Sequence, residues 1–322
     1  MVDFRYHLVS LVAVFLALAV GVVVGTTALN GPVLDDLNHR LAGLRGDNRS
    51  LEAQLRTAQH RSADQDAAAA LLTPTLVHGA LAGQRVVLVS TPDAPAGLRD
   101  GLVPLLQAAG AEVGATVRLR PALLDPASSQ KLDDLVAQVA VPGATVPDGE
   151  PVDQAVAQLS QVLLTRPGTA APRPETVQRV LAAYQSEDLV DVEGAAAQPA
   201  TLALLLTGDP ATAVPSGAAG DALQARERTL VELARALDVH GSGTVVAGSA
   251  AAVRPGGLLA ALRDDSAATD RVSSVDAADT PTGRLGVVLA LREQQAGGSG
   301  SYGSGTGVDG PLPSPVPSPA AS

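Results

Sequence analysis

The N-terminal part of the chain opens with a long run of hydrophobic positions. Residues 9–29 contain no charged side chain, and about 20 apolar residues, at roughly 1.5 Å each, span the hydrocarbon layer of a bilayer. A cleaved secretory signal has a shorter apolar centre and a small-x-small cleavage site, whereas GTTALNG offers no such site here. The pattern therefore favours a retained membrane anchor in residues 1–31 over a signal peptide.

Leucine recurs with heptad spacing directly behind this run, in residues 32–70. With the first leucine at position a, the a and d positions are Leu34, Leu37, Leu41, Leu44, Asn48, Leu51, Leu55 and Ala58. Three and a half heptads of this kind predict a coiled-coil stalk, and an asparagine at an a position is typical of two-stranded coils. An ordinary amphipathic helix that carries one polar residue is the alternative.

The charges beside this seam bear on its partner. In a parallel pair of identical helices, position g of one heptad faces position e of the next heptad on the partner. Arg40 would then face Arg45, and Asp47 would face Glu52. Like charges at such positions disfavour self-pairing. We therefore expect the stalk to bind a different coiled-coil protein, or to form a homo-oligomer only weakly.

Between residues 83 and 295, short apolar runs alternate with helical patterns. The predicted strands are 85–89, 112–119, 201–206, 244–248 and 271–275, and the predicted helices are 98–109, 128–139, 152–166, 175–185, 222–239, 257–263 and 282–294. Apolar strands separated by helices are typical of a mostly parallel sheet with helices on both faces. The sequence thus predicts an α/β domain with a Rossmann-like, doubly wound sheet, followed by a flexible Gly/Ser/Pro tail in residues 296–322.

Composition narrows the classes of function. The net charge of −11 argues against a nucleic-acid partner, because phosphate binding needs a basic surface. The chain has no cysteine and its five histidines are scattered, so the sequence shows no disulfide, no thiolate site and no imidazole cluster. Neither a Walker lysine nor a G-x-S-x-G motif is present. The sequence therefore predicts no enzyme, no catalytic residue and no bound cofactor, and it leaves any metal site unknown.

Polar side chains follow several predicted strands at the point where each strand ends. They are Asp93, Asp209, Ser249 and Asp276, with Asp279 shortly before the last predicted helix. Because ligands of open parallel sheets bind beyond the carboxyl ends of the strands, these side chains form a candidate ligand cleft. Its carboxylates could bind a hard cation or a polar ligand through oxygen. Aspartate and serine also cap helices and stabilise turns, which is the alternative.

Three segments together resemble one known family. They are FRYHLVSLVAVFLALAVGVVVGTTALN, the leucine-rich helix behind it, and SSVDAADTPTGRLGVVLALREQ in residues 273–294. In sequence and order they are similar to the actinobacterial copper transporter family MctB, and the resemblance extends from residue 1 to about residue 295. It implies an envelope membrane protein of copper homeostasis, with copper as the transported ion and an extracytoplasmic C-terminal part. The family has also been proposed for the mycobacterial outer membrane, and some relatives resemble cell-separation proteins that partner regulators of envelope hydrolases.

The residues themselves do not explain copper movement. Cu(I) prefers thiolate and thioether ligands, and the only candidate of either kind is Met1. The Lys/Arg count around the apolar run does not favour an external C-terminal part. Two functions stay open. One is an accessory or oligomeric component of copper transport, single-pass in the cell membrane, and the other is a coiled-coil scaffold for a cell-division or cell-wall partner.

Overall fold

A computed structural model describes residues 4–141, 143, 147–194, 196, 198–212 and 220–313 of the chain. Within these ranges the side chains are described except at residues 4, 5, 26–38 and 221. The chain divides into two compact units, residues 1–65 and 66–322. The first unit is helical, and the second holds the end of the same helix together with all of the strands.

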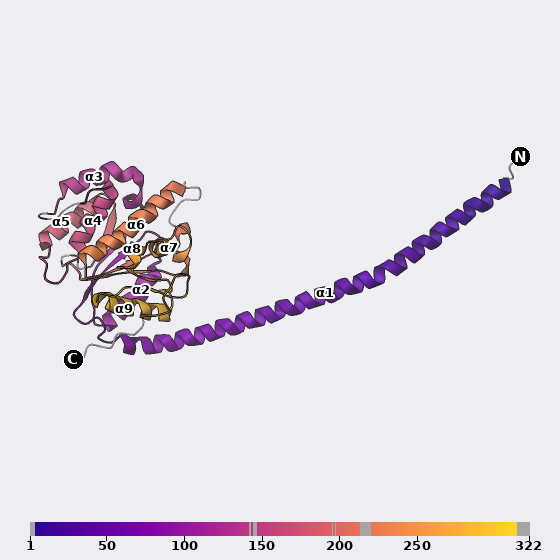
Figure 1. The fold of residues 1–322 in the computed structure, drawn as a ribbon, viewed down its shortest axis with the longest axis horizontal. Helices are drawn as coiled ribbons and strands as arrows, with labels where there is room; N and C mark the ends of the chain where they lie inside the picture. The colour runs from indigo at the N-terminus through magenta and orange to yellow at the C-terminus, as the bar shows by residue number, and fades with distance from the viewer. Residues whose placement is uncertain are drawn as a thin grey trace. The chain divides into compact units, whose positions relative to one another are not determined.

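Helix α1 extends over Phe4–Val77, so the predicted anchor and the predicted stalk belong to one helix (Figure 1). Its segment Tyr6–Gly25 is long and apolar enough to cross a membrane, and none of that segment is buried within the chain. The predicted anchor continues to residue 31, but the side chains of residues 26–31 lie outside the described ones, as do those of Leu34 and Leu37.

The second unit is built on a seven-stranded sheet. Its strands are β1 (Arg85–Ser90), β2 (Glu112–Leu119), β3 (Val190–Glu193), β4 (Leu202–Leu206), β5 (Thr244–Ala247), β6 (Ser273–Val275) and β7 (Ser301–Tyr302), in the spatial order β3-β2-β1-β4-β5-β6-β7. All neighbouring strands run parallel except β2 and β3, which are antiparallel. The mostly parallel sheet predicted from the sequence is thus confirmed. Strand order reverses direction between β1 and β4, which is where open sheets place their ligands.

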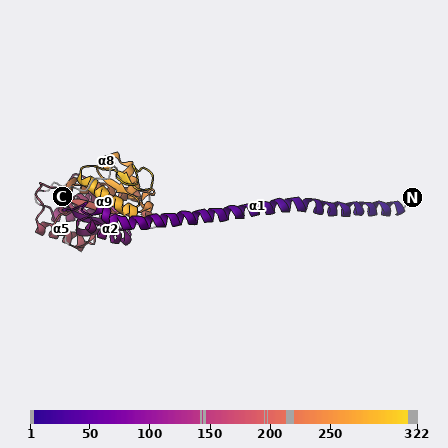
Figure 2. The same cartoon turned by 90° about the horizontal axis from the view of Figure 1, so that it is seen from below.

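Helices cover both faces of this sheet. One face carries α2 (Ala96–Ala108) and α9 (Pro281–Gln295), which lie side by side (Figures 1 and 2). The other face carries α4 (Pro151–Leu163), α6 (Gly220–His240) and α7 (Leu258–Asp264), with α3 (Ser129–Gln138), α5 (Pro174–Ser186) and the short α8 (Ser266–Thr269) beside them. Short 3₁₀ turns at Pro121–Leu124, Pro126–Ser128, Pro210–Thr212 and Ala250–Val253 complete the described elements.

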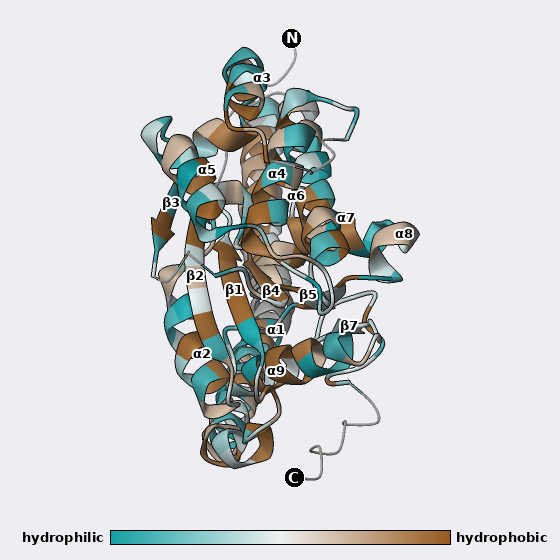
Figure 3. Cartoon of the chain, turned by 90° about the vertical axis from the view of Figure 1, so that its left-hand side faces the viewer, coloured by the Kyte–Doolittle hydropathy of each residue, from teal (hydrophilic) through white to brown (hydrophobic). Residues whose placement is uncertain are grey.

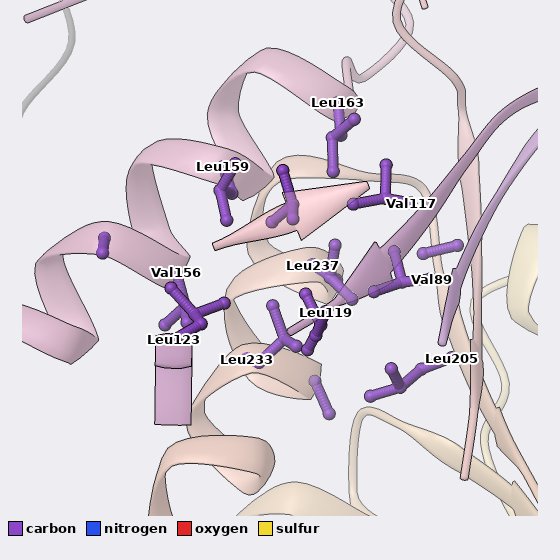
Figure 4. Packing of buried hydrophobic residues seen from close by; sticks show 14 of the residues in the cluster. Val89, Val117, Leu119, Leu123, Val156, Leu159, Leu163, Leu205, Leu233 and Leu237 are labelled. Carbon is purple, nitrogen blue, oxygen red and sulfur yellow. The ribbon is translucent and has the colours of Figure 1, made fainter. Parts of the chain in front are cut away.

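The strands are apolar throughout because both faces of the sheet are buried. Along β1, Val86 and Leu88 pack towards α2 and α9, while Val87 and Val89 pack towards α4 and α6. Figure 3 shows the central strands in the brown of hydrophobic residues, and Figure 4 shows Val89 among leucines of the α4 and α6 layer. Each fully buried valine or leucine stabilises the fold by about 1.5–3 kcal/mol. The core on both faces is therefore built from valine, leucine and alanine, because the chain has few aromatic residues.

The structure differs from the sequence prediction at two strands. Strand β3 has the alternating sequence VDVE and lies at one edge of the sheet, so it lacks the apolar run that marks the buried strands. Strand β7 lies within the expected flexible tail, yet Ser301 and Tyr302 are buried and pair with β6. Residues 296–313 are therefore part of the domain, and only residues 314–322 of the expected tail lie outside the described chain.

Candidate functional site

A buried ion pair lies at the edge of the sheet between β1 and β4, where the strand order reverses. Asp93 follows β1, and one of its carboxylate oxygens lies 2.5 Å from the Nη2 atom of Arg226 on α6. Its other oxygen accepts a hydrogen bond of 3.2 Å from the backbone N–H of Gly208, which follows β4. The side chains of Asp93 and Arg226 are only 1% and 8% exposed. Asp93 therefore joins the loops after β1 and β4 instead of facing an open cleft.

Gly208 allows the two loops to approach this closely. A Cβ atom at position 208 would lie 1.9 Å from the carbonyl oxygen of Asp93, well inside the contact distance of the two atoms. Only glycine fits between the loops without a shift of the backbone. The local sequence thus favours a packed junction at the position where open sheets commonly bind ligands.

Asp209 and Ser249 lie beside this junction, and Asp209 has local partners. Asp209 accepts a hydrogen bond from the backbone N–H of Ala211 and forms an ion pair of 2.6 Å with Arg254. Ser249 precedes the 3₁₀ turn that begins at Ala250, and its side chain makes no capping hydrogen bond there. Asp209 therefore fits the alternative reading of a turn-stabilising aspartate.

Asp276, at the end of β6, is the most enclosed of the predicted site residues. Its two carboxylate oxygens accept hydrogen bonds from the backbone N–H groups of Ser304 and Gly305, at 2.8 and 2.9 Å. The Nη1 atom of Arg263 on α7 lies 2.9 Å away, and both charged side chains are buried. We call residues 301–313, which this carboxylate holds, the C-terminal clasp. The clasp occupies the space beside Asp276 that a ligand of the predicted cleft would need.

Arg263 fixes the clasp from the other side. Its guanidinium donates to the carbonyl oxygens of Tyr302 and Thr306 and to the hydroxyl of Ser274. A Cβ atom at Gly303, which has a φ of +130°, would lie 2.0 Å from Asp276, so only glycine lets the chain pass there. Glycines in this segment therefore do not indicate flexibility alone. Gly303 and Gly305 are needed because the backbone passes close to the buried carboxylate of Asp276.

Asp279 does not join the other acids. It is exposed, and its backbone carbonyl accepts a hydrogen bond from Arg284. The next residue, Thr280, caps α9 by accepting a 3.0 Å hydrogen bond from the N–H of Gly283. This is the usual role of a threonine before a helix.

The predicted carboxylates are thus separated by the arginines that bind them. Asp93, Asp209 and Asp276 pair with Arg226, Arg254 and Arg263 respectively, and the described residues hold no cluster of three or more metal-ligating side chains of His, Cys, Asp or Glu. Each pair cancels the negative charge that a hard cation needs. The sequence could not reveal these pairings, because the arginines lie 133, 45 and 13 residues away along the chain and carry no local motif.

In the described part of the predicted stalk, the leucines at the heptad positions are exposed, as are the side chains around them. Leu41, Leu44, Leu51 and Leu55 are 39–63% exposed, and Asn48 is exposed among them. Glu52 pairs within the helix with Arg56 at 3.6 Å, which is a weak surface contact. A row of exposed leucines on one helix face needs cover from another helix or surface, so this seam is a candidate interaction site.

The apolar segment of α1 gives a direct prediction about retention in the membrane. We expect the double substitution Leu16→Arg and Leu18→Arg to release the protein from membranes, because each central arginine costs about 2.5–3.5 kcal/mol in the bilayer. Leu51→Arg with Leu55→Arg, in the same helix but beyond Tyr6–Gly25, is the matched control and should stay bound. The measurement is the fraction sedimenting after alkaline carbonate extraction. Equal retention of both variants would contradict a spanning role for this segment.

Comparison with known proteins identifies close relatives over nearly the whole chain. A family model described as "Copper transport outer membrane protein, MctB" matches residues 1–313. The protein named "Copper transporter MctB" of Mycobacterium tuberculosis (strain ATCC 25618 / H37Rv) is 33% identical over 321 residues, which cover 96% of this chain and 98% of the relative. Its namesake in Mycobacterium leprae (strain TN) is 31% identical over 329 residues, with the same coverage. The match therefore includes the apolar helix, the stalk and the α/β domain.

Proposed function

The chain belongs to the family of copper transport outer membrane proteins, MctB, and from this membership we propose that it serves copper transport at the cell envelope as a membrane-anchored accessory or oligomeric component. The observation that carries the proposal is the family match over residues 1–313, which joins one apolar helix to an α/β domain. Relatives of nearly equal length bear the name of a copper transporter.

The accessory or oligomeric role follows from what one helix can do. Among the described residues, one segment is long and apolar enough to cross a membrane, and a single helix encloses no pathway for an ion. A pathway therefore needs several copies of the chain or a second membrane protein. The exposed stalk leucines provide a surface on which such an assembly can form.

The proposed placement is a single pass through the cell membrane, with the α/β domain outside the cytoplasm. The family resemblance supports this orientation, while the family description names the outer membrane. Because the chain has no cysteine, a cysteine introduced at the exposed Ser304 would report the location of the domain through its reaction with an impermeant thiol reagent in intact cells.

A scaffold is the second candidate function, and a specific feature of the stalk favours it. The pairs Arg40 with Arg45 and Asp47 with Glu52 would be like-charged in a parallel homodimer, which disfavours self-pairing and favours a different helical partner. In this function the anchor and stalk hold the α/β domain for a cell-division protein or a regulator of cell-wall hydrolases.

One pair of substitutions distinguishes the two functions. Leu44→Glu with Leu51→Glu places two charges on the seam and should abolish assembly, because the carboxylates cannot be buried unpaired. If the protein serves copper transport, a strain carrying this variant should accumulate copper as a deletion strain does. If it is a scaffold, the variant should lose a co-purifying coiled-coil protein while cellular copper is unchanged.

The matched control places the same charges away from the seam. Ala42→Glu with Ala53→Glu lies on the exposed outer face of the described helix and should behave as the wild type in both measurements. In parallel with the strains, calorimetry of the purified full chain with Cu(I) and Cu(II) measures whether the protein itself binds copper. A deletion strain with unaltered copper content and copper tolerance would contradict the transport proposal, whatever the stalk binds.

A further inference from the structure

One cavity of the second unit lies away from the carboxyl edge of the sheet. It has a volume of about 690 Å³ and opens between the C-terminal ends of α4 and α6 and the N-terminal end of α5. Ligand pockets in proteins commonly measure about 300–1,000 Å³. Size therefore allows a small molecule in this cavity, and the side chains that line it decide its chemistry.

The lining is basic although the chain as a whole is acidic. Arg166, Arg173 and His240 line the cavity, and no aspartate or glutamate does so among the described residues. The chain carries a net charge of −11, and its arginines at the carboxyl edge of the sheet are paired with aspartates. Two arginines that line one cavity without a carboxylate favour an anionic ligand.

Several donors in the cavity have no partner within the described chain. The side chain of Arg173 forms no hydrogen bond or ion pair with a described residue, and the same holds for hydrogen bonds of the Thr176 hydroxyl and the His240 imidazole. Arg166 donates from Nε to the carbonyl of Gly241 at 2.7 Å and from Nη2 to that of Asp238 at 3.0 Å. Its remaining terminal nitrogen is left for a ligand.

The surrounding groups hold Arg166 in place. Arg166 is fixed by the carbonyls of Asp238, in the last turn of α6, and of Gly241, just beyond the helix, which is a common arrangement at helix C-termini. The nearby carboxylate of Asp238 is bound to Arg271 at 2.9 Å, so it does not neutralise the cavity. Burial, followed by the positive charge of Arg166, lowers the pKa of His240, so at neutral pH its imidazole serves as a neutral donor or acceptor.

We propose that this cavity binds a small phosphate ester that carries hydroxyl groups. Arg173 and the free terminal nitrogen of Arg166 would bind the phosphate, because guanidinium groups match its oxygens in charge and geometry. Thr176 and His240 would bind the hydroxyls of the ester. The assignment is independent of copper and of the stalk, so it adds a ligand to the α/β domain.

Calorimetry of the full chain in detergent tests the site, with glycerol 3-phosphate as the probe and glycerol as the uncharged control. We expect saturable binding of the phosphate ester and none of glycerol. Arg173→Gln should weaken binding about tenfold, the loss expected for one charge-assisted hydrogen bond. Thr176→Val should weaken it less, because only a neutral hydroxyl is removed. Inorganic phosphate should bind more weakly than the ester, since it lacks the glycerol hydroxyls.

Arg179→Gln is the matched control, because Arg179 is an exposed arginine of the same helix α5 that does not line the cavity. An equal loss in both arginine variants, or no binding by the wild type, would overturn the proposal. Dihexanoyl phosphatidylglycerol, in which a glycerol is held on a phosphodiester, distinguishes the source of the ligand. Binding of this lipid as tight as that of the free ester supports a site open to lipid headgroups, whereas binding of the free ester alone supports a soluble ligand.

Discussion

Replacing Arg226 with methionine should lower the free energy of unfolding of the α/β domain by about 3–5 kcal/mol, because it leaves the carboxylate of Asp93 buried without its counter-ion. Both side chains are almost fully enclosed, and only the N–H of Gly208 would remain to bind the acid. Urea unfolding of the full chain in detergent gives the measurement. The buried Tyr184 and Tyr302 report on the domain through their near-ultraviolet circular dichroism.

An exposed pair of the same chemistry provides the control. Arg254 is 63% exposed where it binds Asp209, so Arg254→Met should cost at most about 1 kcal/mol, as surface ion pairs do. Adding Asp93→Leu to Arg226→Met should restore most of the lost stability, since an apolar pair removes the unpaired charge. Equal losses for Arg226→Met and Arg254→Met would show that the buried pair does not hold the two loops together.

The sequence predicts the buried strands of the fold well and its edges poorly. The ends of strands β1, β2, β4 and β5 lie within one residue of the predicted ranges, because burial on both faces demands an unbroken apolar run. Edge strand β3 needs only one covered face, and β7 is two residues long in a glycine-rich segment. Their pairing depends on neighbours that no local pattern specifies.

The candidate cleft shows the same division between local and long-range information. Each aspartate follows a strand as predicted, so Asp93 and Asp276 do lie where parallel strands end. What they bind is set by Arg226 and Arg263, which are 133 and 13 residues away along the chain. Helix patterns place these arginines on helices but do not say which carboxylate they face. Charge partners of this kind become visible only once the sheet and its helices are assembled.

The second large effect is expected at the C-terminal clasp, where Asp276→Ala should release residues 301–313 from the domain. The substitution removes the acceptor of the Ser304 and Gly305 amides and leaves the buried guanidinium of Arg263 without its carboxylate. The loss of a buried charge partner costs about 3 kcal/mol or more, which corresponds to a change of roughly 100-fold in an equilibrium. Since the clasp follows the last helix, its detachment leaves the other strands paired.

Hydrogen exchange followed by mass spectrometry measures this release directly. Peptides that cover residues 301–310 should exchange about 100-fold faster in Asp276→Ala, while peptides from β1 and β4 keep the protection of the wild type. Asp279→Ala is the control, because it removes an exposed carboxylate three residues further along and should leave exchange unchanged. The clasp also has contacts of its own, namely Tyr302 with Glu293 and Leu312 with α9. Unaltered exchange in Asp276→Ala would mean that these contacts, and not the buried carboxylate, hold the segment on the sheet.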